Sequence, residues 1–286
     1  MTRPYRSALY IPASKPRAME KAQALPCDAI IFDLEDAVAP AAKPAARAAL
    51  AQALGGFAYG GRARLLRVNA LSGPWGAEDL AAVAAMPCEG VLLPKVDSPQ
   101  DIHAAARLMP HPVWAMIETP AGVLNAAAIC AHPRLAGIVV GTNDLLKDLG
   151  GRAGGGRAGA GRAPLHYALG AVLLAARAAG KVALDGVYNA FKDTEGLARE
   201  AEEGRDFGYD GKTVIHPDQI ATVNAVFGPS AADLDLAARQ IAAYDAALAE
   251  GQAVAVVDGR IVEGLHVVTA RALLAKAAAI AEIEGA

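Results

Sequence analysis

The sequence predicts a (β/α)8 barrel of the TIM type followed by a small C-terminal extension. Eight short apolar segments recur along the chain, as expected for parallel strands that are buried on both faces. Alanine-rich segments with apolar residues at helical spacing separate them, which gives the alternation of strand and helix in such a barrel. The main alternative is a doubly wound open sheet, and no GxGxxG turn opens a helix to support it.

Each expected strand ends at or near a polar residue, and the intervening segments carry the helical pattern. The expected strands are Ser7–Pro12, Ala29–Leu34, Leu65–Asn69, Val91–Lys95, Val113–Glu118, Ile138–Gly141, Val182–Val187 and Lys212–His216. The clearest expected helices are Pro16–Ala24, Pro99–Met109, Leu165–Ala179 and Glu195–Glu203.

Two regions depart from this alternation. Residues Gly150–Arg162 are rich in glycine and arginine and predict a flexible loop, although Arg152, Arg157 and Arg162 could instead bind phosphates. Residues 1–228 are therefore expected to form the barrel domain and residues 229–286 an extension. The extension should contain a helix, a hairpin across an Asp-Gly turn and a last helix, at Asp233–Glu250, Asp258-Gly259 and Thr269–Glu284 respectively.

The composition limits the classes of partner. With 54% hydrophobic residues and a formal charge of -3, the chain can bury a large core but lacks the basic excess of a nucleic-acid-binding protein. The three cysteines form no CxxC or Cys/His cluster, so reduced thiols in a cytoplasmic protein are expected. Neither a signal peptide nor a long apolar span is visible, which predicts no membrane association.

The candidate chemistry lies at the strand ends, because TIM-barrel active sites lie at the C-terminal face of the barrel. Glu118 and Asp144 follow neighbouring strands, and two carboxylates at one rim repel each other unless they share a cation or a proton. Mg²⁺ suits such a pair and could polarise the carbonyl of a bound 2-oxo acid. Alternatively, these carboxylates cap the following helices or pair with lysine or arginine.

Arg67 lies inside an apolar strand, where a guanidinium must find an anion. It could bind a substrate carboxylate or thioester oxygen and stabilise an enolate. The other interpretation is a structural ion pair with Glu35, Asp36 or Glu118. Of the three carboxylates in FDLEDAV, one is expected to face the site, because neighbouring strand residues point apart.

Other basic residues near the rim have two interpretations each. Lys95 could be a Schiff-base nucleophile, although a salt bridge explains a lysine among carboxylates better. His216 is expected to be a hydrogen-bonded rim residue. Lys15, Arg17 and Lys21 follow the first strand and could bind the phosphates of coenzyme A or form an ordinary solvated surface.

Seven motifs in order make the sequence similar to the citrate lyase β-subunit-like proteins of the HpcH/HpaI aldolase/citrate lyase family, to which malyl-CoA and citramalyl-CoA lyases are related. The resemblance runs from about Arg6 to Leu274 and covers nearly the whole chain. The motifs are RSALYIPASKP, IIFDLEDAV, RVNA, LLPKVDS, MIETPAG, GTNDL and VIHPDQI.

This resemblance implies a Mg²⁺-dependent carbon–carbon lyase with a TIM-barrel fold. It would split a 3-hydroxyacyl-CoA such as malyl-CoA, citramalyl-CoA or citryl-CoA into acetyl-CoA and a 2-oxo acid, or form one by condensation. By match to the family motifs ETxxG and GxxDL, Glu118 and Asp144 would be metal ligands, and Glu118 would also lie against the substrate. Arg67 matches the substrate-binding arginine of RxN. A homotrimer or a dimer of trimers is implied.

The tail departs from the family pattern. Relatives have GxMxDxP after the hairpin, and their aspartate enters a neighbouring subunit's active site; here Glu263 and Leu265 occupy the aspartate and proline positions. Glu263 is therefore the expected catalytic acid or base, supplied by a partner chain. Two alternatives remain: a class II aldolase joining pyruvate to a free aldehyde, and a non-catalytic paralogue that binds acyl-CoA or an oxo acid.

Overall fold

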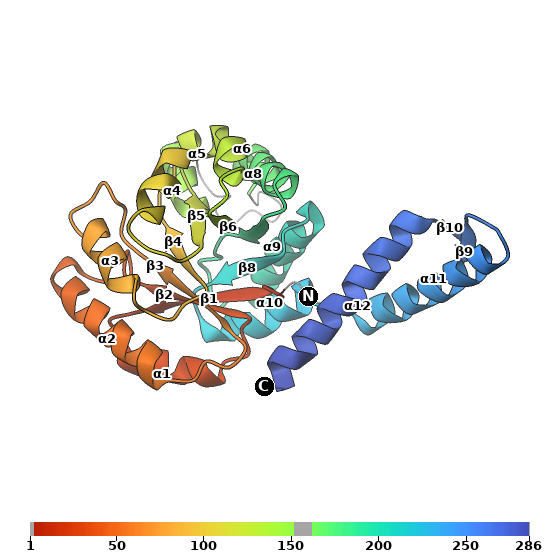
Figure 1. Cartoon of the computed structure of the whole chain (residues 1–286), viewed down its shortest axis with the longest axis horizontal. Helices are drawn as coiled ribbons and strands as arrows, with labels where there is room; N and C mark the ends of the chain where they lie inside the picture. The colour runs from red at the N-terminus through yellow and green to blue at the C-terminus, as the bar shows by residue number, and fades with distance from the viewer. Residues whose placement is uncertain (1–2, 152–161, 286) are drawn as a thin grey trace.

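A computed structural model describes residues 3–151 and 162–285. Eight parallel strands, each paired with its neighbours in chain order, close into a barrel surrounded by helices (Figure 1). The predicted TIM barrel is confirmed. The strands are β1 Ser7–Pro12, β2 Ala29–Asp33, β3 Ala63–Arg67, β4 Gly90–Leu93, β5 Val113–Ile117, β6 Leu135–Val140, β7 Val182–Asp185 and β8 Gly211–Val214.

The helices around the barrel follow the predicted order, with small differences at their ends. For example, the helix predicted over Pro99–Met109 ends at Ala106. The helices are α1 Pro16–Lys21, α2 Lys43–Gly56, α3 Gly76–Val83, α4 Pro99–Ala106, α5 Pro120–Leu124, α6 Ala126–Cys130, α7 Thr142–Asp148, α8 His166–Ala178, α9 Thr194–Phe207 and α10 Ile220–Phe227.

The strands are buried on both faces, which explains their continuous apolar sequences. On β2, Ile30 and Phe32 belong to the large core between barrel and helices, whereas Ile31 belongs to the small core inside the barrel. Trp114 fills much of the interior. A side chain at either Gly90 or Gly137 would collide with the indole ring, so these glycines make room for it.

Several predicted strands extended too far at their C-terminal ends. Asn69, Lys95, Glu118, Gly141 and His216 all follow the last paired residue of their strand. These residues therefore lie at the C-terminal rim of the barrel and not within its strands.

The prediction of a flexible, solvated loop was wrong at Arg162, which is buried and 7% exposed. Arg162 pairs with Asp185, and Lys212 Nζ lies 2.9 Å from the same carboxylate. Burial acts to raise the pKa of Asp185, but Lys212 and Arg162 together hold it below its ordinary value. A buried aspartate needs such counter-charges, so Arg162 is a structural anchor. Arg152 and Arg157 lie outside the described residues.

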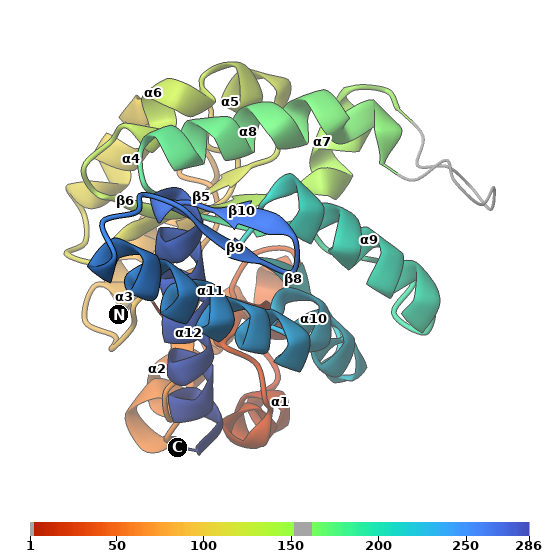
Figure 2. The ribbon, with the colours of Figure 1, turned by 90° about the vertical axis from the view of Figure 1, so that its right-hand side faces the viewer.

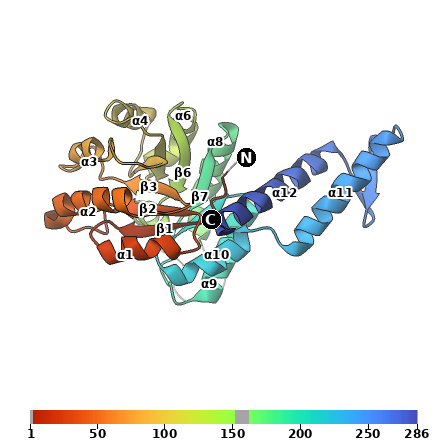
Figure 3. The same ribbon diagram turned by 60° about the horizontal axis from the view of Figure 1, so that its bottom comes forward.

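The C-terminal extension consists of α11 Ala231–Ala249, β9 Ala255–Val257, β10 Arg260–Val262 and α12 Gly264–Gly285. It projects from the barrel, and its hairpin lies along α11 (Figures 2 and 3). Asp258 and Gly259 have φ values of 50° and 74°, as the predicted Asp-Gly hairpin turn requires. The last helix begins five residues before the predicted Thr269.

Helix α12 is long and apolar enough, by length and composition alone, to cross a membrane. Core helices of soluble proteins pass the same test, so this is weak support for a span. Here α12 packs against α11, and its Arg271 and Glu284 pair with Asp245 and Arg6 at 3.2 and 3.0 Å. The absence of membrane association stays a prediction.

Candidate active site

A cavity of about 350 Å³ opens at the C-terminal ends of the strands. Arg67 from β3, Glu118 after β5 and Asp144 in the first turn of α7 all line it. Three of the residues singled out from the sequence therefore converge on one space, in the part of the barrel where substrates bind in enzymes of this fold.

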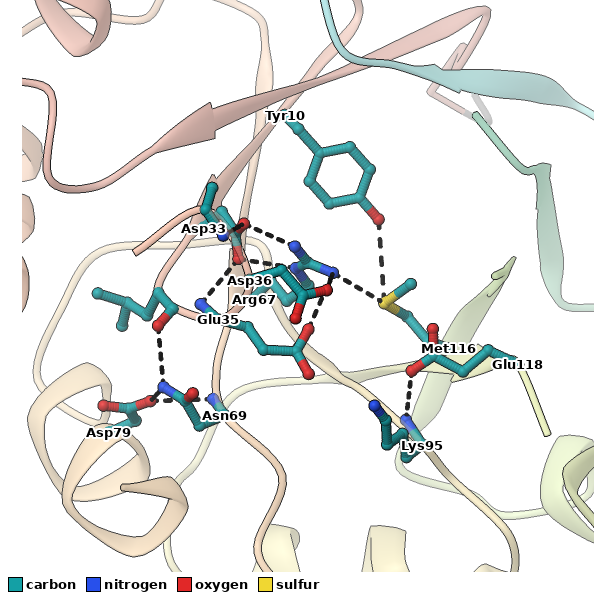
Figure 4. A network of polar contacts seen from close by, with 12 residues as sticks. Tyr10, Asp33, Glu35, Asp36, Arg67, Asn69, Asp79, Lys95, Met116 and Glu118 are labelled. Carbon is teal, nitrogen blue, oxygen red and sulfur yellow. Dashed lines mark hydrogen bonds and ion pairs between the residues drawn. The ribbon is translucent and has the colours of Figure 1, made fainter. Parts of the chain in front are cut away.

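Arg67 is fixed by an ion pair with Asp33, its register neighbour on β2 (Figure 4). Nε and Nη2 of Arg67 donate to the two oxygens of Asp33 at 2.7 and 2.6 Å, and Tyr10 presents its ring 4.9 Å from the guanidinium. Burial acts to lower the pKa of Arg67, but Asp33 raises it well above the ordinary value. The guanidinium is therefore always charged.

The third guanidinium nitrogen of Arg67, Nη1, lies near two carboxylates of the turn that follows β2. Nη1 lies 2.9 Å from Glu35 and 3.4 Å from Asp36. Of the pairings that the sequence left open, Glu35 and Asp36 are present, whereas no ion pair with Glu118 forms among the described residues. Because Nη1 is the least constrained donor and Arg67 lines the cavity, it is the donor available to a substrate oxygen.

A buried clamp holds the acidic turn that follows β2. Lys43 Nζ donates to the carbonyl oxygens of Leu34 and Glu35 at 2.9 Å each and to Asn69 Oδ1 at 2.7 Å. Asn69 Nδ2 donates in turn to Leu34 O and to Asp79, which is fully buried. The clamp fixes the backbone of Glu35 and thereby the carboxylates that surround the arginine.

Glu118 is 2% exposed and is positioned by two backbone features. Its Oε1 accepts the N–H of Lys95 at 2.8 Å, and any side chain at Gly141 would collide with its carboxylate. Burial raises the pKa of Glu118 to about 7, the Lys95 N–H opposes the rise, and Asp144 adds to it. Asp144 thus lies close enough to Glu118 for its negative charge to raise the pKa of Glu118.

The charges around the cavity suit a divalent cation. Asp33, Asp36, Glu118 and Asp144 line the cavity, and Arg67 is the one cation among its described lining residues; Glu35 contacts Arg67, and the Lys95 N–H contacts Glu118. Burial raises the pKa of Glu35 to about 8, even though Arg67 opposes the rise. Burial is the main cause of the raised pKa values of Glu35 and Glu118, and neighbouring carboxylates add to it; a bound dication would favour the charged form of such carboxylates.

The donor set suits Mg²⁺ better than Zn²⁺. Within residues 3–151 and 162–285, no group of three or more His, Cys, Asp or Glu residues is arranged to hold a metal ion. Glu118 and Asp144 can supply two carboxylates, and Mg²⁺ commonly binds one or two and completes its shell with water and substrate oxygens. A structural zinc site would need four protein ligands.

Other predicted site residues lie away from the cavity. Glu263 is exposed on the C-terminal extension, where its N–H donates to His266 Nδ1 at 2.9 Å. One chain does not bring Glu263 to its own cavity, so its entry into a partner's site stays a prediction. Lys15, Arg17 and Lys21 are exposed on and beside α1, and within the described ranges their side chains make no ion pair. Their binding to coenzyme A also stays a prediction.

The two remaining rim candidates have distinct environments. Lys95 is exposed; burial acts to lower its pKa, but Asp144 and Glu118 raise it overall, which disfavours a Schiff-base nucleophile. The expected salt bridge does not form either, within the part of the chain that the structure describes. His216 accepts from the Asp218 N–H at 3.2 Å and stacks on Phe191, as expected for a rim residue.

Sequence reasoning missed the roles of Asp33, Tyr10 and Gly141. The signal for Asp33 was available: it ends β2 as Arg67 ends β3, and neighbouring strands of a parallel barrel bring such positions side by side. Gly141 begins the GTNDL motif, but its contact with Glu118, like that of Tyr10 with Arg67, depends on distances across the barrel that no local pattern shows.

Comparison with known proteins agrees with this geometry. Residues 6–217 match the HpcH/HpaI aldolase/citrate lyase family. The chain is 57% identical over 279 residues to a (3S)-malyl-CoA thioesterase of Cereibacter sphaeroides, covering 97% of this chain and 96% of that protein. It is 35% identical to the citrate lyase subunit beta of Escherichia coli, covering 96% and 94%.

A solved structure shows the same likeness in three dimensions. The protein CitE from Mycobacterium tuberculosis, in complex with magnesium, acetoacetate and coenzyme A, aligns with a TM-score of 0.80 and 34% sequence identity, covering 95% of this chain and 97% of that one. The chain belongs to the HpcH/HpaI aldolase/citrate lyase family, as its ordered motifs predicted.

Proposed function

We propose that this protein is a Mg²⁺-dependent enzyme that hydrolyses the thioester bond of a malyl-type 3-hydroxyacyl-CoA. The observation that carries the proposal is the convergence of Arg67, Glu118 and Asp144 on one cavity. The 57% identity to a (3S)-malyl-CoA thioesterase over nearly both whole chains supports the choice of substrate and bond. The CitE structure with magnesium and coenzyme A supports the metal and the thiol carrier.

The residues of the site have distinct roles in this reaction. Glu118 and Asp144 hold the metal, which when bound supplies Lewis-acid polarisation of a substrate oxygen. Arg67 donates from Nη1 to the thioester oxygen as negative charge develops on it, and Asp33 keeps the guanidinium in place. Lys15, Arg17 and Lys21 bind the phosphates of coenzyme A on the exposed side of α1.

The second candidate is carbon–carbon cleavage, the reaction predicted from the sequence. The same arrangement of one arginine and a metal-binding carboxylate pair can stabilise the enolate that this cleavage produces. The likeness to a citrate lyase subunit favours it. In this reaction Glu263 from a partner chain exchanges the proton of the acetyl unit, which requires a homo-oligomer such as a trimer or hexamer. A cytoplasmic location goes with either reaction.

Product analysis separates the two reactions. Purified protein is incubated with malyl-CoA, with Mg²⁺ or with excess chelator. Hydrolysis consumes one water and releases malate and a free thiol, whereas cleavage releases acetyl-CoA and glyoxylate without a thiol. We expect thiol and malate in equal amounts, only with Mg²⁺. Glyoxylate with acetyl-CoA would favour the second candidate.

The alternatives from the sequence have their own outcomes in this assay. No turnover of malyl-CoA, together with condensation of pyruvate and a free aldehyde, would indicate a class II aldolase. Binding without any turnover would indicate a non-catalytic paralogue. In addition, neutralising Lys15, Arg17 and Lys21 together should raise the KM for malyl-CoA about tenfold if these residues bind the phosphates.

A further inference from the structure

Lys95 has a backbone conformation that lysine rarely adopts. Its φ is +52°, in the left-handed region, and the only other non-glycine residue of the described chain with a positive φ is Asp258 in the hairpin turn. No glycine or asparagine makes this turn easy. Such strain persists only where the surrounding structure imposes it, and it often marks a functional position.

In the strained turn, the backbone amide and the side chain of Lys95 have different environments. Its N–H donates to Glu118 Oε1 at 2.8 Å, and the chain then returns to the sheet, where Val96 N–H donates to Met116 O at 3.2 Å. Pro94 and Val96 on either side are buried, whereas Lys95 is exposed. The turn thus aims an amide at the buried carboxylate and places the side chain at the rim.

Lys95 is exposed at the rim beside Glu118, and its side chain makes no ion pair within the described ranges of the chain (Figure 4). Asp144 and Glu118 are the largest of the influences that raise its pKa, so the ammonium is charged. Arg67, in contrast, is held by two hydrogen bonds to Asp33. Lys95 can therefore bind a second anionic group of the substrate, in addition to the oxygen that Arg67 Nη1 contacts.

We propose that Lys95 has two separable roles: its N–H orients Glu118, and its ammonium binds the free carboxylate of a dicarboxylic acyl thioester. The inference rests on the proposed function and adds the residue that selects a substrate with a second carboxylate. A phosphate of coenzyme A is the other anion with suitable chemistry. The position of Lys95 beside the metal-binding pair, rather than beside α1, favours the carboxylate.

Substitution of Lys95 separates the two roles. Lys95→Gly keeps the N–H and suits the positive φ but lacks the ammonium. Lys95→Arg keeps the charge. Lys95→Pro removes the N–H, and its thermal unfolding transition is recorded to show that it folds. Lys181→Gly, at the opposite end of the barrel where β7 begins, is the matched control and should behave as wild type.

Steady-state kinetics and calorimetry test the side chain. For Lys95→Gly we expect the KM for malyl-CoA, and for a malyl thioester without phosphates, to rise about tenfold or more, with kcat nearly unchanged. Lys95→Arg should recover most of the affinity. The KM for 3-hydroxybutyryl-CoA, or the Kd if it is bound without turnover, should change less than about twofold. An increase confined to thioesters that carry phosphates, or equal for all thioesters, would overturn the assignment.

Mg²⁺ affinity, measured by titration calorimetry without substrate, tests the backbone. Lys95→Gly should retain the wild-type affinity within about twofold, and folded Lys95→Pro should lose about tenfold or more. Equal loss in both variants would show that the roles are not separable. If the wild type does not turn over malyl-CoA, the proposed function fails; the lysine is then judged by Mg²⁺-dependent binding of malate, and unchanged affinity in Lys95→Gly refutes it.

Discussion

Glu118 makes the stability of the metal-free protein depend on pH in a direction that can be tested. Burial raises its pKa from the ordinary value of 4.5 to about 7. Between these two values the folded state binds more protons than the unfolded state, so the free energy of unfolding falls as the pH rises. The contribution is complete below pH 4.5, and about 3 kcal/mol is lost by the time the pH exceeds 7.

The assay is urea unfolding, followed by circular dichroism, of the wild type and of Glu118→Gln at pH 5 to 8 in chelator. Subtracting the two pH profiles cancels the titration of groups that do not interact with Glu118. The amide oxygen of the variant can still accept the Lys95 N–H, so the backbone contact is kept. The difference should show the wild type losing stability relative to the variant as the pH rises.

Magnesium should reverse this loss in the wild type only. At a concentration about 100 times its Kd, a ligand that binds only the folded state adds about 2.7 kcal/mol. At pH 8 saturating Mg²⁺ should therefore restore most of the stability of the wild type and little of that of Glu118→Gln. A flat difference between the two pH profiles, or equal stabilisation of both proteins by Mg²⁺, would refute the placement of Glu118 as a buried metal ligand.

Three further substitutions test other parts of the site and its frame. Gly141→Ala should displace the carboxylate behind it and lower kcat about 100-fold with an unchanged circular dichroism spectrum; wild-type kinetics would contradict the packing. Arg67→Lys should lower kcat/KM at least about 100-fold, because lysine cannot form both hydrogen bonds to Asp33. A loss below tenfold would contradict the proposed role of the guanidinium. Lys212→Met should lower the free energy of unfolding by about 3–5 kcal/mol, since it leaves Asp185 short of a counter-charge, and a loss under about 1 kcal/mol in urea unfolding would show otherwise.

The features of the site that could be predicted from the sequence are those fixed by the barrel itself. Once eight strands are recognised, the C-terminal end of each must lie on one rim. The placement of Arg67, Glu118 and Asp144 around one cavity follows from that rule, because each stands at or just after a strand end. Their identity as substrate and metal ligands is a further step, which came from the family motifs.

Contacts between segments far apart in the sequence were much harder to predict. Arg162 stands in a stretch of glycine and arginine whose local pattern indicates a loop, and nothing local marks it as a partner of Asp185 on β7. The residue that could have indicated this ion pair is its partner, Asp185. An aspartate inside an apolar strand requires a counter-charge, and Lys212 on the next strand satisfies only one of its oxygens.

The backbone conformation of Lys95 likewise could not be predicted from the local sequence. Left-handed turns are expected from glycine or asparagine, and the sequence LLPKVDS contains neither. The conformation is instead imposed from outside, by Glu118, which is buried and needs a donor, and by Pro94 and Val96, which are held in the core. Several tertiary contacts can together impose a backbone conformation that the residue type disfavours. Residues in such conformations are often functional. A lysine that keeps an unfavourable backbone beside a proposed metal ligand is therefore better explained by what its amide and ammonium do than by its own preferences.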